Sequence, residues 1–223
     1  QEEFWKQLDV PYFLRHDAQE IAWQTRHLYR HHNGEAPIVK ARLSPIGEGL
    51  QVMVYVPDQA QLFARLCGYF GATGYNIVDA KIHTTRHGYA LDTFQIMGSI
   101  TSPGYREMIE SIDSELVARL QAQAPLARAV RGRISRQLRH FPIQAEVNIR
   151  PDEKGQFHVL SVTAGDRPGL LHSLALVLGN YALDIHMAKV ITLGGRAEDV
   201  FVVSGSALEN PRAVLLLEQD LLE

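Results

Sequence analysis

Apolar residues recur along this chain in two periodic patterns, one typical of strands and one typical of helices. The two patterns follow each other in the same order in both halves of the chain. Short or alternating apolar runs, typical of strands, cover 38–44, 50–56, 76–85 and 89–97, and then 143–150, 157–163, 183–192 and 198–204. Stripes at helical spacing cover 59–71, 103–123, 168–180 and 211–222. Each half therefore predicts the element order ββαββα.

The two halves also match residue by residue, which indicates an internal repeat. A shift of 108 positions superposes Asp58 on Asp166, and the same shift aligns five pairs of apolar or small residues and two further polar pairs. After a one-residue adjustment in a turn, Asp92 meets Asp199 and Phe94 meets Phe201. The chain is therefore expected to hold two copies of one small fold.

Each predicted helix has a single apolar stripe, so both helices of a copy must bury it against the same face of the sheet. The fold class is therefore α+β, with two tandem ferredoxin-like sandwiches. No strand follows the second helix, so the first strand of each copy is expected to fill the edge position beside the next strand. The predicted organisation is a helical lead-in (1–36), a first copy (37–124), a linker (125–141) and a second copy (142–223).

The lead-in predicts an apolar turn at Phe4 and a helix capped by Asp17 that ends near Asn33-Gly34. The dipeptide His16-Asp17 also occurs in metal hydrolases, but a metal site needs several converging ligands, so no metal is assigned. The linker holds five arginines without interleaved aromatic residues, which favours a solvated or carboxylate-paired connector over a nucleic-acid site.

The composition narrows the classes of function. A formal net charge of −3 argues against a general role on nucleic acid or membrane surfaces, and no apolar run approaches the ~20 residues of a membrane span. The single cysteine, Cys67, excludes an internal disulfide and fits a reducing, cytoplasmic setting. No secretory signal pattern opens the chain. The chain starts without Met, which suggests a piece of a longer protein.

The turn at residues 166–171 is the main candidate site. It joins a predicted strand to a predicted helix, and unpaired N–H groups at a helix start favour a small anion such as a carboxylate. Pro168 suits the first helical turn, and Gly169 lacks the Cβ that would keep a ligand away from the backbone.

Three segments of the second copy resemble an ACT domain, a small amino-acid-sensing module: 162–171 (VTAGDRPGLL), 183–192 (LDIHMAKVIT) and 198–201 (EDVF). The first copy and the lead-in resemble a narrower family. Segments 12–16 (YFLRH), 22–28 (AWQTRHL), 79–86 (DAKIHTTR) and 90–94 (ALDTF) resemble the C-terminal region of the bifunctional uridylyltransferase/uridylyl-removing enzymes of bacterial nitrogen control.

That resemblance implies that the chain is a regulatory region with no catalytic residues of its own. The nucleotidyltransferase and HD-type hydrolase domains that add UMP to the PII signalling protein and remove it would lie outside this chain. Mg²⁺ would belong to those domains, and no cofactor is expected here. The expected ligand is glutamine, and PII would be a partner of the full-length enzyme.

The resemblance also implies where an amino acid would bind. The turn supplies Asp166, Arg167, Gly169, Leu170 and Leu171, with the amides of Gly169 and Leu170 directed at the carboxylate. The Asp166 side chain either accepts from the ammonium or caps the helix. Candidate residues from the strands and from the first copy's turn are Asn76, Val78, Asp184, His186 and Asp58.

Some alternatives stay open at this point. Asn76 and Asp184 also suit the turn that precedes a strand. In the first copy Gln61 stands in the place of Gly169, which predicts the better site in the second copy, and Gly169→Val is expected to block binding with little loss of fold. An ACT pair for another amino acid, a structural dimerisation module and a stand-alone enzyme are the competing functions. No catalytic constellation accompanies Arg167, which argues against the enzyme, and an exposed edge strand makes a dimer plausible.

Overall fold

The computed structural model describes residues 2–98, 104–122, 143–193 and 195–222. The predicted linker, 125–141, lies outside the described residues. In the part of the chain that the structure describes, no helix is long and apolar enough to cross a membrane.

The lead-in forms three short helices, α1 (Glu2–Trp5), α2 (Val10–Arg15) and α3 (Ala18–Leu28). The predicted cap of α3 is confirmed, since the Asp17 side chain accepts from the Glu20 amide at 2.8 Å. Two details differ from expectation. The helix ends at Leu28, before Asn33-Gly34, and α2 was not predicted because its six residues are too few to show a helical period. His16, next to the cap, lies 2.9 Å from the Tyr12 carbonyl through Nδ1.

Both copies have the predicted order ββαββα. The first contains β1 (Ile38–Leu43), β2 (Leu50–Pro57), α4 (Leu62–Ala72), β3 (Asn76–Lys81), β4 (Tyr89–Met97) and α5 (Tyr105–Gln121). The second contains β5 (Glu146–Pro151), β6 (His158–Gly165), α7 (Leu170–Asn180), β7 (Asp184–Leu193), β8 (Arg196–Ser204), a 3₁₀ turn η1 (Ser206–Glu209) and α8 (Pro211–Leu222).

Several boundaries are shorter than the sequence pattern suggested. Strand β3 ends at Lys81, and of the residues expected beyond it Thr84 forms only an isolated bridge, to Ala90. Helices α4 and α7 begin at Leu62 and Leu170, each after a residue in the left-handed region: Gln61 (φ 57°) and Gly169 (φ 82°). The α7 helix therefore starts two residues after Pro168, because the chain must first turn through a backbone conformation that a helix does not contain.

The eight strands form one antiparallel sheet in the order β1-β2-β4-β3-β7-β8-β6-β5. The first strand of each copy lies at an outer edge, as predicted. The two copies join through β3 and β7, where Ala80 pairs with Ala188, its own equivalent in the repeat. A local twofold relation therefore runs through the centre of the sheet, and the sheets of the two copies align within one chain.

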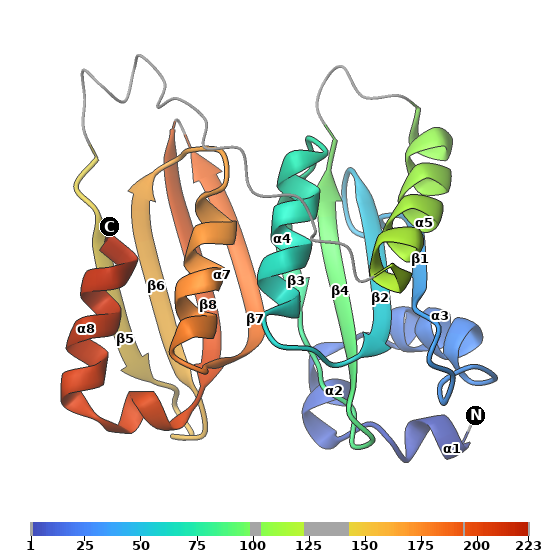
Figure 1. Cartoon of the computed structure of the whole chain (residues 1–223), viewed down its shortest axis with the longest axis horizontal. Helices are drawn as coiled ribbons and strands as arrows, with labels where there is room; N and C mark the ends of the chain where they lie inside the picture. The colour runs from blue at the N-terminus through green and yellow to red at the C-terminus, as the bar shows by residue number, and fades with distance from the viewer. Residues whose placement is uncertain (1, 99–103, 123–142, 194, 223) are drawn as a thin grey trace.

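Helices α4, α5, α7 and α8 cover one face of this sheet, as Figure 1 shows, with α4 and α7 side by side at the centre. Their apolar stripes form the main core with the strands. The opposite face of the first copy is covered by the lead-in, whose Phe4, Tyr12 and Leu28 pack against Tyr55 and Leu91. The lead-in is therefore part of the folded unit.

Candidate functional site

The structure has a cavity at each end of the α4–α7 helix pair. The first, of about 560 Å³, lies between the β6–α7 turn and the beginning of β3. Its lining includes residues 166–172 and 74–78, with Val190 and Thr192 of β7 and Ala197 and Asp199 of β8. This size is within the usual range for small-molecule sites. We name it the first cavity.

The second cavity, of about 950 Å³, lies at the other end of the helix pair, between the β2–α4 turn and the beginning of β7. Its lining repeats that of the first through the internal symmetry. Asp58, Thr84 and Asp92 stand where the first cavity has Asp166, Thr192 and Asp199. Each cavity is thus built from the turn of one copy and the strand of the other.

The ten residues predicted from the sequence divide between these cavities. The first cavity collects seven of them: Asn76, Val78, Asp166, Arg167, Gly169, Leu170 and Leu171. The second collects the remaining three, Asp58, Asp184 and His186. The expectation that the beginning of β3 faces residues 166–171 agrees with this geometry. Asp184 and His186 serve the other cavity, because β7 pairs with β3 in the antiparallel sense and its start lies near the first copy's turn.

One of the two amides of the β6–α7 turn that were expected to face a carboxylate is already hydrogen-bonded within the turn. The Leu170 amide donates to the Arg167 carbonyl at 3.1 Å, and the equivalent Leu62 amide donates to Gln59 at 3.2 Å. The Leu170 N–H is therefore used to close the turn. Asp166 does not cap α7, since the N-cap position is Gly169 and receives no side-chain bond.

The conformation of Gly169 also corrects one expected outcome. Its φ of 82° is in the region that residues with a Cβ rarely adopt, and β-branched residues are the least tolerant. Gly169→Val would therefore strain the turn itself, and little loss of fold can no longer be expected. A binding test needs a variant whose backbone conformation is unrestricted.

Gln61 makes the two cavities unequal. Its side chain donates from Nε2 to Asn180 Oδ1 at 3.1 Å, and a Cβ added to Gly179 would meet Gln61 Cγ at 3.0 Å. Gln61 therefore fills the corner between the start of α4 and the end of α7. In the first cavity the equivalent position is Gly169, which has no side chain to place there.

The lead-in forms one wall of the second cavity, and among the described residues it has no counterpart at the first. Asp9 lies 3.7 Å from His83, and the Arg15 guanidinium lies 5.3 Å from the Phe157 ring centre. The Phe157 ring in turn contacts His186 edge-on. Burial, and then the Arg15 charge, lower the pKa of His186 to about 4. Helix α2 thus joins both copies at this cavity.

The sequence analysis did not select Asp199 and Asp92 as site residues, although each lines a cavity. Both are only 1% exposed. The available signal was their place in the strand alternation: Asp199 falls between Ala197 and Phe201 on the core-facing side of β8, where an apolar residue is the norm. The same signal occurs at Asp92 in β4.

The first cavity is lined by groups of both charges and by an amide. Arg167, on the rim, offers a cation, whereas Asp166 and Asp199 offer carboxylates. Asn76 has both a donor and an acceptor in its amide. Among the residues of the four described ranges, no three His, Cys, Asp or Glu side chains gather as a metal site would require.

Comparisons with known proteins show which family the chain belongs to. Residues 1–27 match the family model described as "Uridylyltransferase GlnD fifth domain". The chain is 54% identical over 98% of its length to the bifunctional uridylyltransferase/uridylyl-removing enzyme of Cupriavidus pinatubonensis. It is 52% and 53% identical, over 100% and 98% of its length, to the enzymes with the same name from Ralstonia nicotianae and Chromobacterium violaceum. The chain spans 26% of the length of each of these relatives. The chain therefore belongs to the family of the bifunctional uridylyltransferase/uridylyl-removing enzymes and corresponds to about a quarter of their length.

Proposed function

We propose that this chain is the amino-acid-sensing C-terminal region of an enzyme that adds UMP to the PII protein and removes it, and that its ligand is free glutamine. The relatives' name supplies the two opposed activities. The enzyme would act in the cytoplasm, and PII would be bound by the full-length protein. The chain's own part would be to report the glutamine concentration.

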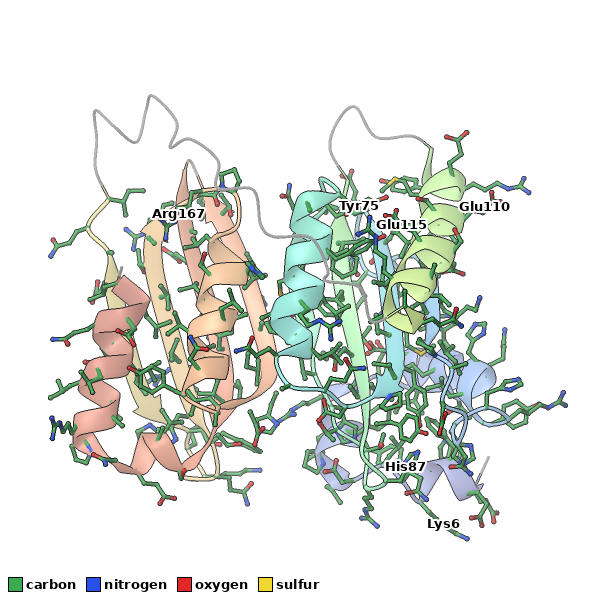
Figure 2. The ribbon with its side chains drawn as sticks, in the orientation of Figure 1. Lys6, Tyr75, His87, Glu110, Glu115 and Arg167 are labelled. Atoms are coloured by element: carbon green, nitrogen blue, oxygen red, sulfur yellow. The ribbon has the colours of Figure 1, made fainter. Side chains whose placement is uncertain are left out.

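The observation that carries this proposal is the position and lining of the first cavity. The cavity has groups for each end of an amino acid: Arg167 and the Gly169 amide for the carboxylate, aspartates for the ammonium and Asn76 for a side-chain amide. Arg167 lies at the upper end of α7 in Figure 2, where the turn opens to solvent.

A regulatory role fits a cavity that lies between the two copies. Because its walls come from β3 of one copy and the β6–α7 turn of the other, an occupant contacts both. Such a ligand favours the arrangement of the copies in which both contacts form, and it shifts any equilibrium to which that arrangement is coupled. Coupling to the activities would require the full-length enzyme.

The test is a calorimetric titration of this chain with glutamine, glutamate and the other common amino acids, supported by thermal shifts. Arg167→Ala removes one charge-assisted contact and is expected to weaken glutamine binding about 10-fold or more. Arg212→Ala is the matched control, because Arg212 is exposed on α8 and lines neither cavity.

Three results would overturn the proposal in different ways. Binding of another amino acid in place of glutamine would indicate a different sensor. Absence of binding by every amino acid would leave a structural role. Equal loss of affinity in Arg167→Ala and Arg212→Ala would place the ligand elsewhere.

A further inference from the structure

Asp199 is a carboxylate in a position where packing alone calls for an apolar side chain. It lies between Val162 of β6 and Val190 of β7 in the sheet register, on the face that carries the core. Its side chain is 1% exposed, and neither Oδ1 nor Oδ2 has a hydrogen-bond partner among the described residues. It nevertheless lines the first cavity.

The first copy repeats this arrangement. Asp92 is 1% exposed, lines the second cavity, and has no partner for Oδ1 within the described part of the chain. A second aspartate stands at the turn beside each one, Asp166 by Asp199 and Asp58 by Asp92. Each cavity is therefore lined by one buried aspartate that has at least one unpartnered oxygen.

A buried carboxylate without partners is costly, since desolvation disfavours its charged form by several kcal/mol. Burial, and then the charge of Asp166, raise the pKa of Asp199 to about 7. Burial and the charge of Asp58 likewise raise the pKa of Asp92. Buried polar groups in proteins normally have partners, so a pair of exceptions aimed into cavities calls for an explanation.

We propose that Asp199 accepts the α-ammonium of the amino acid that occupies the first cavity, and that Asp92 is the corresponding amine receptor of the second cavity. This inference rests on the proposed function, because it names the group that recognises one end of the same ligand. Arg167 and the turn take the carboxylate end.

Binding of an amino acid to Asp199 would displace a proton. In the empty cavity near neutral pH a substantial share of Asp199 carries a proton, whereas the complex needs the carboxylate opposite –NH₃⁺. Binding therefore releases that proton to solvent, and affinity rises with pH until Asp199 is ionised in the free protein. The other titratable groups that line the first cavity are Cys67, Tyr75, Asp166, Arg167 and His172.

The experiment is calorimetry of this chain with glutamine in two buffers of different ionisation enthalpy, from pH 6 to pH 8. The wild type is expected to release protons, more at pH 6 than at pH 8. Asp199→Asn, which keeps the size of the side chain, is expected to bind glutamine at least ~10-fold more weakly and to lose most of the release. Glu198→Gln is the control, because Glu198 lies on the opposite face of β8 and pairs with Arg196 at 2.8 Å.

Ligand variants test the same contact without any change to the protein. N-acetylglutamine, which has no ammonium, is expected not to bind, whereas glutamine amidated at its α-carboxylate should keep the dependence on Asp199. Asp92→Asn is expected to leave the high-affinity site unchanged and to remove any second, weaker binding event.

The outcomes separate this inference from the proposed function. Wild-type affinity and proton release in Asp199→Asn, or tight binding of N-acetylglutamine, would overturn the inference while leaving glutamine sensing in place. Loss of binding of a different amino acid in Asp199→Asn would support the ammonium contact and refute glutamine as the ligand. Absence of binding by every amino acid would overturn both.

Discussion

The buried carboxylate of Asp199 makes a prediction about the folded state itself. Asp199→Asn removes a group that is neutral at low pH and must ionise in the core at high pH. Because the folded-state pKa, about 7, lies above the usual value of 3.8, the native protein holds the proton over an interval in which the unfolded chain has lost it. Stability therefore falls as pH rises through that interval.

The magnitude follows from the size of the shift. A difference of roughly 3 pKa units at 1.36 kcal/mol per unit is a penalty of about 4 kcal/mol, fully present above pH 7 and absent below about pH 3.8. Between pH 4.5 and pH 8 the wild type should lose about 3 kcal/mol from this group. The asparagine variant has no such slope, and its own desolvation cost is independent of pH.

The assay is urea unfolding of wild type and Asp199→Asn at steps between pH 4.5 and pH 8, without amino acids in the buffer. The stability of the variant relative to wild type should rise by about 3 kcal/mol across this range. Asp92 and the carboxyl groups that do not interact with Asp199 are common to both proteins and cancel in the difference. Glu198→Gln removes one negative charge from the same strand and controls for net charge.

A stability difference that stays constant with pH would refute this reasoning, because it would mean that Asp199 has the same pKa in the folded and unfolded states. A slope of the opposite sign would mean that the folded protein stabilises the carboxylate. Either result would also remove the physical basis for proton release on binding.

Three further predictions concern stability alone and are measured by urea unfolding at pH 7. Gly169→Ala should cost roughly 1–2 kcal/mol, because Gly169 has a φ of 82° that a residue with a Cβ rarely adopts. Gly71→Ala should stabilise the protein by up to about 1 kcal/mol, because Gly71 lies inside α4 and has open space where the Cβ would be. Equal effects of the two changes would contradict the conformational argument. Lys81→Ala should cost about 3 kcal/mol of unfolding free energy, because it leaves the buried Glu20 carboxylate without its cation. Glu20 is 1% exposed and lies 2.5 Å from Lys81. If Glu20→Gln added to Lys81→Ala recovered no stability, this account would be wrong. Asp17→Ala should cost about 1 kcal/mol through loss of the α3 cap, and Asp17→Asn should retain most of it.

Local features of the fold were predictable because they depend on neighbours in the sequence. The period of apolar residues gave both helices and all four strands of each copy, and the chain order placed β1 and β5 at the edges. The boundaries were less accurate. Helix α2 is too short to show a period, and the late starts of α4 and α7 follow from left-handed residues that a hydrophobic pattern does not record.

The candidate site was predictable only in part. The turn at 166–171 and its opposition to Asn76 and Val78 were expected, and the structure brings these residues to one cavity. Asp184 and His186 were expected at the same site, as candidate residues from the strands. The structure places them at the second cavity, where the lead-in forms a wall that no local pattern could indicate.

The sequence by itself determined that the chain is a duplicated α+β fold, because repetition and periodicity are properties of residue order. The tertiary structure alone decided that β3 pairs with β7 about Ala80 and Ala188, which sets each turn against the strand of the other copy. The tertiary structure also decided which aspartate side chains are buried away from water. Desolvation depends on atoms brought together from distant parts of the chain, so the burial of Asp199 and Asp92 becomes visible only when the sheet and helices are assembled.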